Sequence, residues 1–360
     1  MALAFLVYFS LMIIMFCGGR LFASNPKHYY FSGVLFPILI FALIIGLRDN
    51  VGIDFPAYKD TYLFGYDIER MEPGYVLLNN VLKFFQMPSW LLFSLVAFLQ
   101  IFFISMFFVK IPVIYRWFPF FYFTTLYAFF SVNGLRQSIA FSIIVFSIYS
   151  IYEKKLLKYL ILVLFAASFH QSALLFLPFY FFINNDWLKR RSIQYAFYLC
   201  ASVFAILVAE KLWIYFDLFI QMSGFSGYNP LSLVDVDWEN SDGRGLGRIF
   251  WFIVDSFTIF LSPQIKQKYE RTPIIPCYNL YFIGILLEPI AGSSYLMRFN
   301  VYFVNFRIII YSFLFYWVFK NNNQIIYKVT ASFLLIGFIA FMCQAIIVGA
   351  SGCSPYKFIF

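Results

Sequence analysis

Long apolar stretches separated by short polar breaks recur along the whole chain. An α-helix needs about 20 mostly apolar residues to cross the hydrocarbon layer of a bilayer. The pattern predicts membrane spans at 2–19, 31–47, 90–109, 117–131, 137–152, 156–169, 171–184, 193–209, 249–263, 274–291, 299–319 and 329–350. We therefore expect an all-α polytopic membrane protein with about 12 (10–14) transmembrane helices and two longer external loops.

The predicted spans between 117 and 184 are short for a bilayer crossing. They are candidates for half-helices or re-entrant segments, which membranes tolerate where such segments are buried in protein or line a cavity. The first apolar run, 2–19, lacks a basic flank and a small-residue cleavage site, so it is expected to be a retained span rather than a signal peptide.

Composition supports a membrane protein without a soluble domain. The chain of 360 residues is 62% hydrophobic and 12% charged, whereas soluble proteins carry about 25% charged residues. We therefore expect one integral membrane domain over 1–360. The five cysteines lie far apart without C-x-x-C spacing, so neither a metal nor a cofactor is predicted.

The distribution of basic residues predicts the orientation in the membrane. Six alternate breaks between the predicted spans are rich in lysine and arginine and contain three acids, Glu153, Asp186 and Glu270. Short cytoplasmic loops are enriched in basic residues, so these breaks are assigned to the cytoplasm. Both termini and the two longest loops, 48–75 and 210–248, are then expected outside. The net charge of +9 reflects this topology, and no soluble basic face indicates nucleic-acid binding.

Four polar clusters are predicted to lie together at the outer interface: "GLRDNVGID" (46–54), "SVNGLRQSIA" (131–140), "SFHQSAL" (168–174) and "EPIAGSSYLMRFNVYF" (288–303). Taken singly, Arg48, Arg136 or Arg298 is more often an interfacial anchor than a functional residue. Together they lie on the side where basic residues are disfavoured. Two sets follow helical spacing and each forms one stripe, which indicates a lined cavity: Asn133, Arg136, Gln137 and Ala140, and Tyr295, Arg298, Tyr302 and Asn305.

Candidates for proton transfer occur in two of the outer segments. His170 is one of two histidines, and histidine exchanges protons near neutral pH, although a structural role for it is equally open. Asp54 and Glu72 supply carboxylates in a loop shaped by glycine and proline. The other histidine, His28, is expected at the cytoplasmic interface.

Two further charges fall inside predicted spans. An ionised residue within the membrane is costly and is usually paired, so we expect Asp255 and Arg307 to be partners. Arg307 follows Arg298 by nine positions, which on a continuous helix of 3.6 residues per turn places the two on opposite faces. Arg307 is accordingly expected to serve the structure.

Arginines, a histidine and carboxylates at a lipid-accessible face suit an anionic substrate that arrives in the membrane. Arginine binds phosphate in a bidentate manner, and fixed arginines stabilise a leaving pyrophosphate without a metal. A polyprenyl pyrophosphate fits these groups, with its isoprenoid in the bilayer and its sugar outside. Other anionic lipids fit nearly as well.

The chain also resembles a known family. "GLRDNVGIDFPAY", "EPGYVLLN", "NGLRQSIA", "SFHQSALLFLP", "RFNVYF" and "SPYKF" are similar, in this order, to the motifs of the EpsG/Wzy-type polysaccharide polymerases, the O-antigen polymerase group. The matching positions are Arg48, Gly52, Asp54, Tyr58, Glu72, Gly74, Tyr75, Arg136, Gln137, His170, Ser172, Arg298 and Tyr302.

The resemblance implies a glycosyltransferase that joins repeat units carried on undecaprenyl pyrophosphate, on the outer side of the bacterial plasma membrane. A surface polysaccharide such as an O-antigen of lipopolysaccharide, a capsule or an exopolysaccharide would be its product. Candidate partners besides this substrate and membrane lipid are a chain-length regulator and a flippase of the same pathway, with no nucleic acid.

The resemblance assigns residues to three roles. Arg48, Arg136 and Arg298 are expected to bind pyrophosphate. His170 or Asp54 is expected to act as the base, with Glu72 a third catalytic candidate. The residues expected to bind other parts of the substrate are Tyr58, Gln137 and Tyr302. Neither loop 210–248 nor the first 45 residues match a motif of the family; the loop is expected to read the particular glycan, with Trp238 as a sugar-stacking platform.

Two alternatives remain. A flippase of lipid-linked oligosaccharides would be expected to show inverted repeats and charges near the midplane, whereas the polar clusters lie at one face. Another polyprenyl-dependent glycosyl- or acyltransferase is also compatible with a lipid carrier. An acyltransferase would need a histidine beside a cytoplasmic acyl donor, and His28 is the histidine expected on that side.

Overall fold

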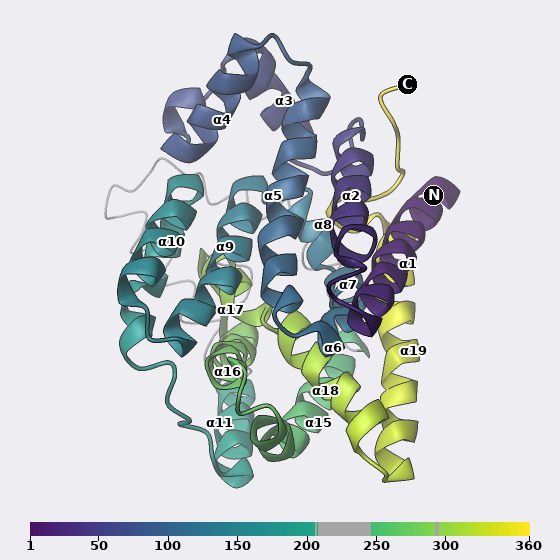
Figure 1. Ribbon diagram of the computed structural model, residues 1–360, viewed down its shortest axis with the longest axis vertical. Helices are drawn as coiled ribbons and strands as arrows, with labels where there is room; N and C mark the ends of the chain where they lie inside the picture. Colours follow the sequence, from purple (N-terminus) through teal and green to yellow (C-terminus); the bar gives the residue numbers. More distant parts are fainter. Residues whose placement is uncertain (206, 208–245, 292–294) are drawn as a thin grey trace. The chain divides into compact units, whose positions relative to one another are not determined.

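The computed structural model describes residues 1–205, 207, 246–291 and 295–360, and these residues are mostly helical (Figure 1). The described part contains no strand, apart from one isolated antiparallel bridge between Arg48 and Phe358. The chain packs as two compact units, one formed by 1–184 with 311–360 and the other by 185–310. The all-α prediction is thus confirmed for the described residues.

Seven described helices are long and apolar enough to cross a membrane: Ala2–Ser24, Ser89–Val109, Leu135–Tyr152, Leu246–Lys268, Ile274–Ala291, Met297–Asn321 and Ile325–Val348. Three shorter apolar helical segments are Phe31–Gly46, Leu156–Phe169 and Gln171–Phe181. The chain is therefore a multi-pass membrane protein, while the predicted count of about 12 spans is not confirmed. The orientation of the termini stays a prediction, as does a single domain over 1–360.

The first unit consists of the N-terminal helices and the last one. Its elements are α1 (Ala2–Ser24), η1 (Phe31–Leu35), α2 (Phe36–Gly46), α3 (Phe55–Phe64), η2 (Ile68–Arg70), α4 (Pro73–Phe84), α5 (Ser89–Val109), α6 (Pro112–Tyr115), α7 (Trp117–Thr124), α8 (Tyr127–Ser131), α9 (Leu135–Tyr152), α10 (Leu156–Phe169), η3 (Gln171–Phe181), α19 (Ile325–Val348) and η5 (Ala350–Gly352). Helix α5 packs between α2 and α9, and α9 packs on α10.

Aromatic side chains form the core that joins α7 to the C-terminal part of this unit. The ring of Phe121 lies 4.9 Å from that of Phe315 and 5.2 Å from that of Phe338, and Trp117 stacks on Phe319 at 5.8 Å. Offset and edge-to-face pairs of this kind stabilise a core beyond their burial. Part of the phenylalanine content of the chain is thereby assigned to packing.

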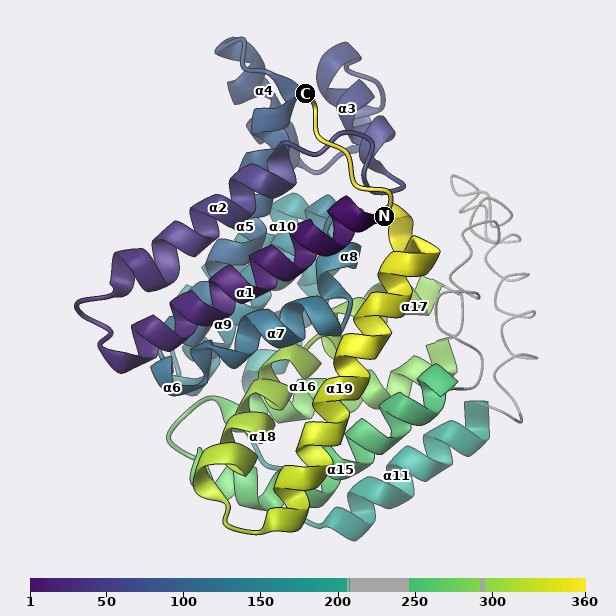
Figure 2. The ribbon, with the colours of Figure 1, turned by 90° about the vertical axis from the view of Figure 1, so that its right-hand side faces the viewer.

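One end of the first unit carries the polar segments. The short helices α3 and α4 and the C-terminal segment, which runs as a coil, all lie at this end (Figures 1 and 2). Asp49 N donates to Lys357 O (2.9 Å), and Ile359 N donates to Leu47 O (3.1 Å). The segment at 351–359 therefore closes over the loop that follows α2.

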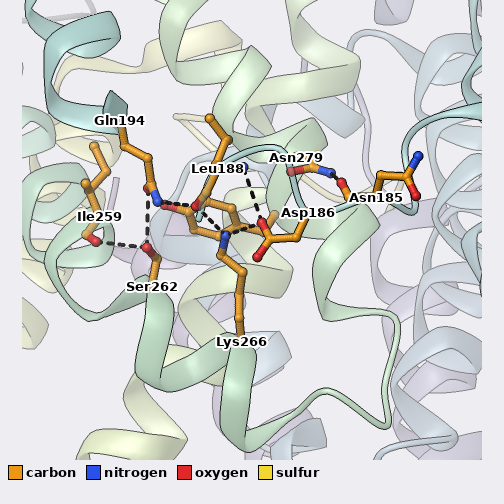
Figure 3. A network of polar contacts seen from close by, with 9 residues as sticks. Asn185, Asp186, Leu188, Gln194, Ile259, Ser262, Lys266 and Asn279 are labelled. Atoms are coloured by element: carbon orange, nitrogen blue, oxygen red, sulfur yellow. Dashed lines mark hydrogen bonds and ion pairs between the residues drawn. The ribbon is translucent and has the colours of Figure 1, made fainter. Parts of the chain in front are cut away.

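The second unit consists of α11 (Arg191–Phe204), α15 (Leu246–Lys268), α16 (Ile274–Ala291), α17 (Tyr295–Val304) and the start of α18 (Arg307–Asn321). A buried polar network ties the connection at 185–190, which precedes α11, to these helices (Figure 3). Lys266 Nζ donates to Asp186 Oδ1 (2.7 Å) and to Leu188 O (2.8 Å), and Gln194 Nε2 also donates to Leu188 O (2.6 Å). Buried hydrogen-bonded networks favour one arrangement of the chain.

The two intramembrane charges are partners, as predicted. Arg307 Nη2 donates to Asp255 Oδ2 at 2.7 Å, and Tyr281 donates its hydroxyl to the other carboxylate oxygen of Asp255 at 2.7 Å. A third member, Glu288, was not predicted and accepts from Arg307 Nη1 at 2.7 Å. Within the candidate span Met297–Asn321, a two-residue turn at Asn305 and Phe306 separates α17 from α18, so the rotation that a regular helix implies from Arg298 to Arg307 does not apply.

Candidate active site

A carboxylate at the start of α4 is the centre of the candidate site. Glu72 occupies the N-cap position in extended backbone (φ −68°, ψ 148°), and Pro73 opens the helix. Proline suits the first helical position because its missing N–H would have no partner there and its φ is already helical. The chain thus turns at Glu72, and the side chain of Glu72 is buried.

Gly74 allows this turn to approach the end of α10. A Cβ atom at Gly74 would lie 2.5 Å from Ser168 Oγ and 2.8 Å from Ser168 O. Both distances are shorter than any ordinary carbon–oxygen contact, so only glycine fits. The close approach brings Glu72 beside His170, two residues after Ser168.

Both oxygens of the Glu72 carboxylate are bound. Oε1 accepts from His170 Nδ1 at 2.8 Å and from the backbone N–H of Gln171 at 3.4 Å, and Oε2 accepts from Arg136 Nη1. Desolvation raises the pKa of Glu72, but the hydrogen bond from His170 and the positive charge of Arg136 outweigh it and lower this pKa to about 2. Glu72 is therefore ionised at neutral pH.

The ionised carboxylate fixes the tautomer of His170. A carboxylate can only accept, so Nδ1 must carry the proton that it donates to Glu72. Nε2 of the neutral ring is then an acceptor, and 28% of the side chain is exposed. His170 lies between α10 and η3 in extended backbone (φ −158°). A histidine held in this way can take a proton from a hydroxyl group.

Arg136 and Tyr58 complete the cluster. Arg136 is the second residue of α9, and its guanidinium also contacts the Tyr58 hydroxyl, on α3. Burial raises the pKa of Tyr58, against the opposing effect of the Arg136 charge. Arg136 Nε is buried and has no hydrogen-bond partner among the described residues. The Arg136 side chain as a whole is 21% exposed, so part of it stays accessible from outside.

The structure thus brings together four of the predicted residues from separate elements: Tyr58, Glu72, Arg136 and His170. Arg136 is 64 positions and His170 is 98 positions from Glu72 in sequence. Each of them was predicted from the sequence, but Glu72 was not distinguished there from the other carboxylates of the same loop. Glutamate followed by proline is the signal of a helix start that would have placed Glu72 more closely.

Arg48 takes a different place, in the interior next to the α2 end. It is 1% exposed, and it donates to the carbonyl oxygens of Ile45 (2.7 Å), Val51 (3.1 Å) and Val132 (3.2 Å). Its guanidinium lies 4.8 Å from the ring of Phe93, and burial lowers its pKa to about 10. Through these contacts Arg48 holds the loop that follows α2 in place. Its role as a phosphate ligand stays a prediction.

Asn133 links the same loop to α9. Its Oδ1 accepts from the backbone N–H of Asp54 (3.2 Å), while its Nδ2 donates to Ser351 O (2.8 Å). Asp54 itself is exposed at the start of α3, four residues before Tyr58. Asn133 therefore ties the first loop and the C-terminal segment to the helix that carries Arg136.

The remaining predicted residues lie elsewhere. Gln137 is buried in α9. Arg298 is exposed and Tyr302 is buried on α17, in the second unit. Trp238 lies outside the described residues. Roles for these residues, and for Asp54, stay predictions. The described residues contain no cluster of ligands suited to a metal ion.

Comparison with known proteins identifies the family. The EpsG family model matches residues 33–358. The chain belongs to the EpsG family. The match includes every described residue of the candidate site, from Tyr58 to His170. No curated protein and no solved structure matched the chain. The candidate site is therefore defined by the contacts of its own residues.

Proposed function

We propose that this EpsG family protein is a glycosyltransferase that joins oligosaccharide repeat units carried on undecaprenyl pyrophosphate. The observation that carries the proposal is the Glu72 carboxylate, which holds a histidine and an arginine together at one end of a membrane-spanning unit. Family membership supports a role in polysaccharide polymerisation. The product would be a bacterial surface polysaccharide.

In the proposed reaction His170 acts as the general base. A sugar hydroxyl of the incoming unit attacks the first sugar carbon of the growing chain, and its proton passes to Nε2 of His170. The new glycosidic C–O bond replaces the C–O bond to pyrophosphate, which leaves on its lipid. Glu72 stabilises the imidazolium that forms, as a carboxylate does when it orients a catalytic histidine.

Arg136 has the complementary role of stabilising the leaving group. Negative charge accumulates on the pyrophosphate as the bond breaks, and a fixed guanidinium favours that state over the ground state. The Arg136 side chain is 21% exposed, which leaves part of it open to a phosphate group. Tyr58 contacts the same guanidinium and supports its position.

The proposed site belongs on the outer face of the plasma membrane. The charge pattern assigns 48–75, which contains Tyr58 and Glu72, to an external loop. Lipid-linked repeat units with outward-pointing sugars would reach such a site from the bilayer. Cysteine substitution at Asp67, in this loop, followed by labelling of intact cells should succeed. Labelling only after permeabilisation would contradict the orientation.

The reaction is tested with purified protein in liposomes supplied with lipid-linked repeat units. His170→Ala should lower the rate of chain growth by at least about 100-fold, the usual contribution of a general base, while lipid substrate still binds. His28→Ala is the matched control, because His28 is the other histidine and is remote in sequence. Unchanged chain growth in His170→Ala would refute the proposed base.

The arginine is tested in the same assay. Arg136→Ala should abolish long chains, whereas Arg70→Ala should not, because Arg70 is an exposed arginine paired with Asp67. Lipid-linked units that cross the bilayer without being joined would instead favour the flippase alternative.

A further inference from the structure

Two contacts join the start of α3 to the start of α9. In the first, Asn133 Oδ1 accepts from the backbone N–H of Asp54 at 3.2 Å. In the second, the Tyr58 hydroxyl contacts the Arg136 guanidinium. On α3 the backbone N–H of Tyr58 donates to Asp54 O at 3.2 Å, and Arg136 follows Asn133 by three positions. The four residues thus form a closed ring of contacts, with two members from each segment.

The hydrogen bonds of the Asn133 amide fix its orientation. Its Nδ2 donates to Phe129 O at 3.1 Å and to Ser351 O at 2.8 Å. Its Oδ1 then faces the backbone N–H of Asp54, because an amide turned the other way would set its oxygen against two carbonyl oxygens. Asn133 is 7% exposed, and a buried polar group with its bonds made favours one arrangement of its neighbours.

Gly52 allows the first loop to come this close to Asn133. Its φ of +99° lies in the left-handed region that favours glycine. A Cβ atom at this position would lie 3.1 Å from Asn133 Oδ1 and 3.0 Å from Val132 O. Val132 O also accepts from Arg48 Nη2 at 3.2 Å. The loop before α3 therefore lies against the turn before α9, and the contact of Asn133 with Asp54 is part of that fit.

We infer that Asn133 is a positioning residue for glycosyl transfer: it holds the start of α3 so that Tyr58 fixes the Arg136 guanidinium. The role of Arg136 rests on the proposed function, whereas the role of Asn133 is new. A fixed guanidinium favours the transition state, and a displacement of about 1 Å can cost about 100-fold in rate. Glu72 binds the same guanidinium, so loss of the Tyr58 contact has a smaller effect.

Steady-state kinetics of chain growth tests this inference, with purified full-length protein in liposomes and lipid-linked repeat units. Asn133→Ala should lower kcat about tenfold and leave KM within about twofold, because a displaced guanidinium loses most where negative charge accumulates in the transition state. Tyr58→Phe removes the hydroxyl, keeps the ring and should have a similar effect. The double variant should be at most about twofold slower than either single variant, because both changes break the same contact.

A second buried amide provides the matched control. Gln100 is 2% exposed, and its Nε2 donates to Ser131 O at 3.0 Å and to Leu135 O at 3.2 Å. These carbonyls lie on either side of Asn133 in sequence, and neither bond reaches α3. Gln100→Ala should therefore lower stability while kcat stays within about threefold of the wild type. All rates are compared below the unfolding temperature of each variant.

Two further measurements keep the inference testable if Asn133→Ala folds poorly. Gly52→Ala pushes the first loop away from the Asn133 amide, and it should give the same loss of kcat without adding to that of Tyr58→Phe. Hydrogen exchange of the peptide that contains Asp54 reports the contact without catalysis. Exchange should be faster than in the wild type in Gly52→Ala and Asn133→Ala, and unchanged in Gln100→Ala.

The outcomes separate this inference from the proposed function. Wild-type kcat in folded Asn133→Ala, or losses that multiply in the double variant with Tyr58→Phe, would overturn the positioning role. An equal loss of kcat in Gln100→Ala would overturn the assignment to the contact with Asp54. A wild-type protein that joins no repeat units would refute the proposed function instead, and hydrogen exchange would still show whether Asn133 holds the start of α3.

Discussion

Replacement of Glu72 by glutamine tests the candidate site most directly, because the side chain keeps its shape and loses its charge. The carboxylate accepts from both His170 and Arg136. A glutamine has one acceptor oxygen, and its amide nitrogen must face one of these two donors. The variant therefore breaks one contact and weakens the other.

The pKa of Glu72 gives the expected magnitude. It is lowered from 4.5 to about 2, and one pKa unit corresponds to about 1.4 kcal/mol, so the folded state favours the ionised form by about 3 kcal/mol. Because the folded-state pKa is depressed, this stabilisation is fully present above about pH 4.5. It is lost as the pH falls through the folded-state value near 2.

Equilibrium unfolding in mixed micelles, measured as a function of pH, checks this expectation. Glu72→Gln should be less stable than the wild type by about 3 kcal/mol at neutral pH. The difference should shrink as the solution is acidified below about pH 4.5. Glu69→Gln is the matched control, because Glu69 is an exposed residue three positions earlier, and it should change stability by less than about 0.5 kcal/mol.

The same variant also has an expected effect on activity. Without the carboxylate, the proton on His170 Nδ1 is no longer fixed, so chain growth should fall even under conditions where the variant is folded. A stability difference that does not change with pH would refute the argument that the charge of Glu72 is bound by its neighbours. Full activity in the folded variant would refute the pairing of Glu72 with His170.

Three further variants test the surroundings of the site and the second unit. Gly74→Ala should destabilise the protein by about 1–3 kcal/mol and slow chain growth, because its methyl group meets the Ser168 backbone; thermal unfolding and the chain-growth assay measure both. Arg48→Met should cost about 3–5 kcal/mol by leaving buried carbonyls unbound, and a stable variant that lost only lipid binding would instead make Arg48 a ligand. Arg307→Gln should cost a similar amount, and adding Asp255→Asn should recover part of it in the same unfolding measurement.

The sequence was most informative about elements and single residues. Apolar runs predicted the positions of helices, because a helix needs about 20 mostly apolar residues to cross a bilayer and few other structures need so long an apolar run. The type of helix could not be predicted for the short apolar segments. For example, η3 is a 3-10 helix of 11 residues, but its residues are of the same apolar types as those of a longer transmembrane span. The break between α17 and α18 has neither proline nor glycine at Asn305 and Phe306, so no local signal marked it.

Pairings within the site could not be read from the sequence. Glu72 meets His170 across 98 positions, and such contacts depend on how helices pack rather than on local pattern. Arg48 and Arg136 look alike in sequence, since each follows a glycine-containing turn at a helix end. The two arginines differ in the partners of their N–H donors. Arg48 donates to backbone carbonyls, whereas Arg136 donates to Glu72 and keeps one N–H without a hydrogen-bond partner among the described residues.

The C-terminal segment that closes over the first polar loop has a consequence for biogenesis. Gly52 N donates to Gly352 O, and Arg48 pairs with Phe358, so the early loop contacts residues that leave the ribosome about 300 positions later. Nascent chains must insert α19 before the segment at 351–359 can reach these partners. The surroundings of this loop are therefore completed last, because a chain without the segment at 351–359 lacks these partners.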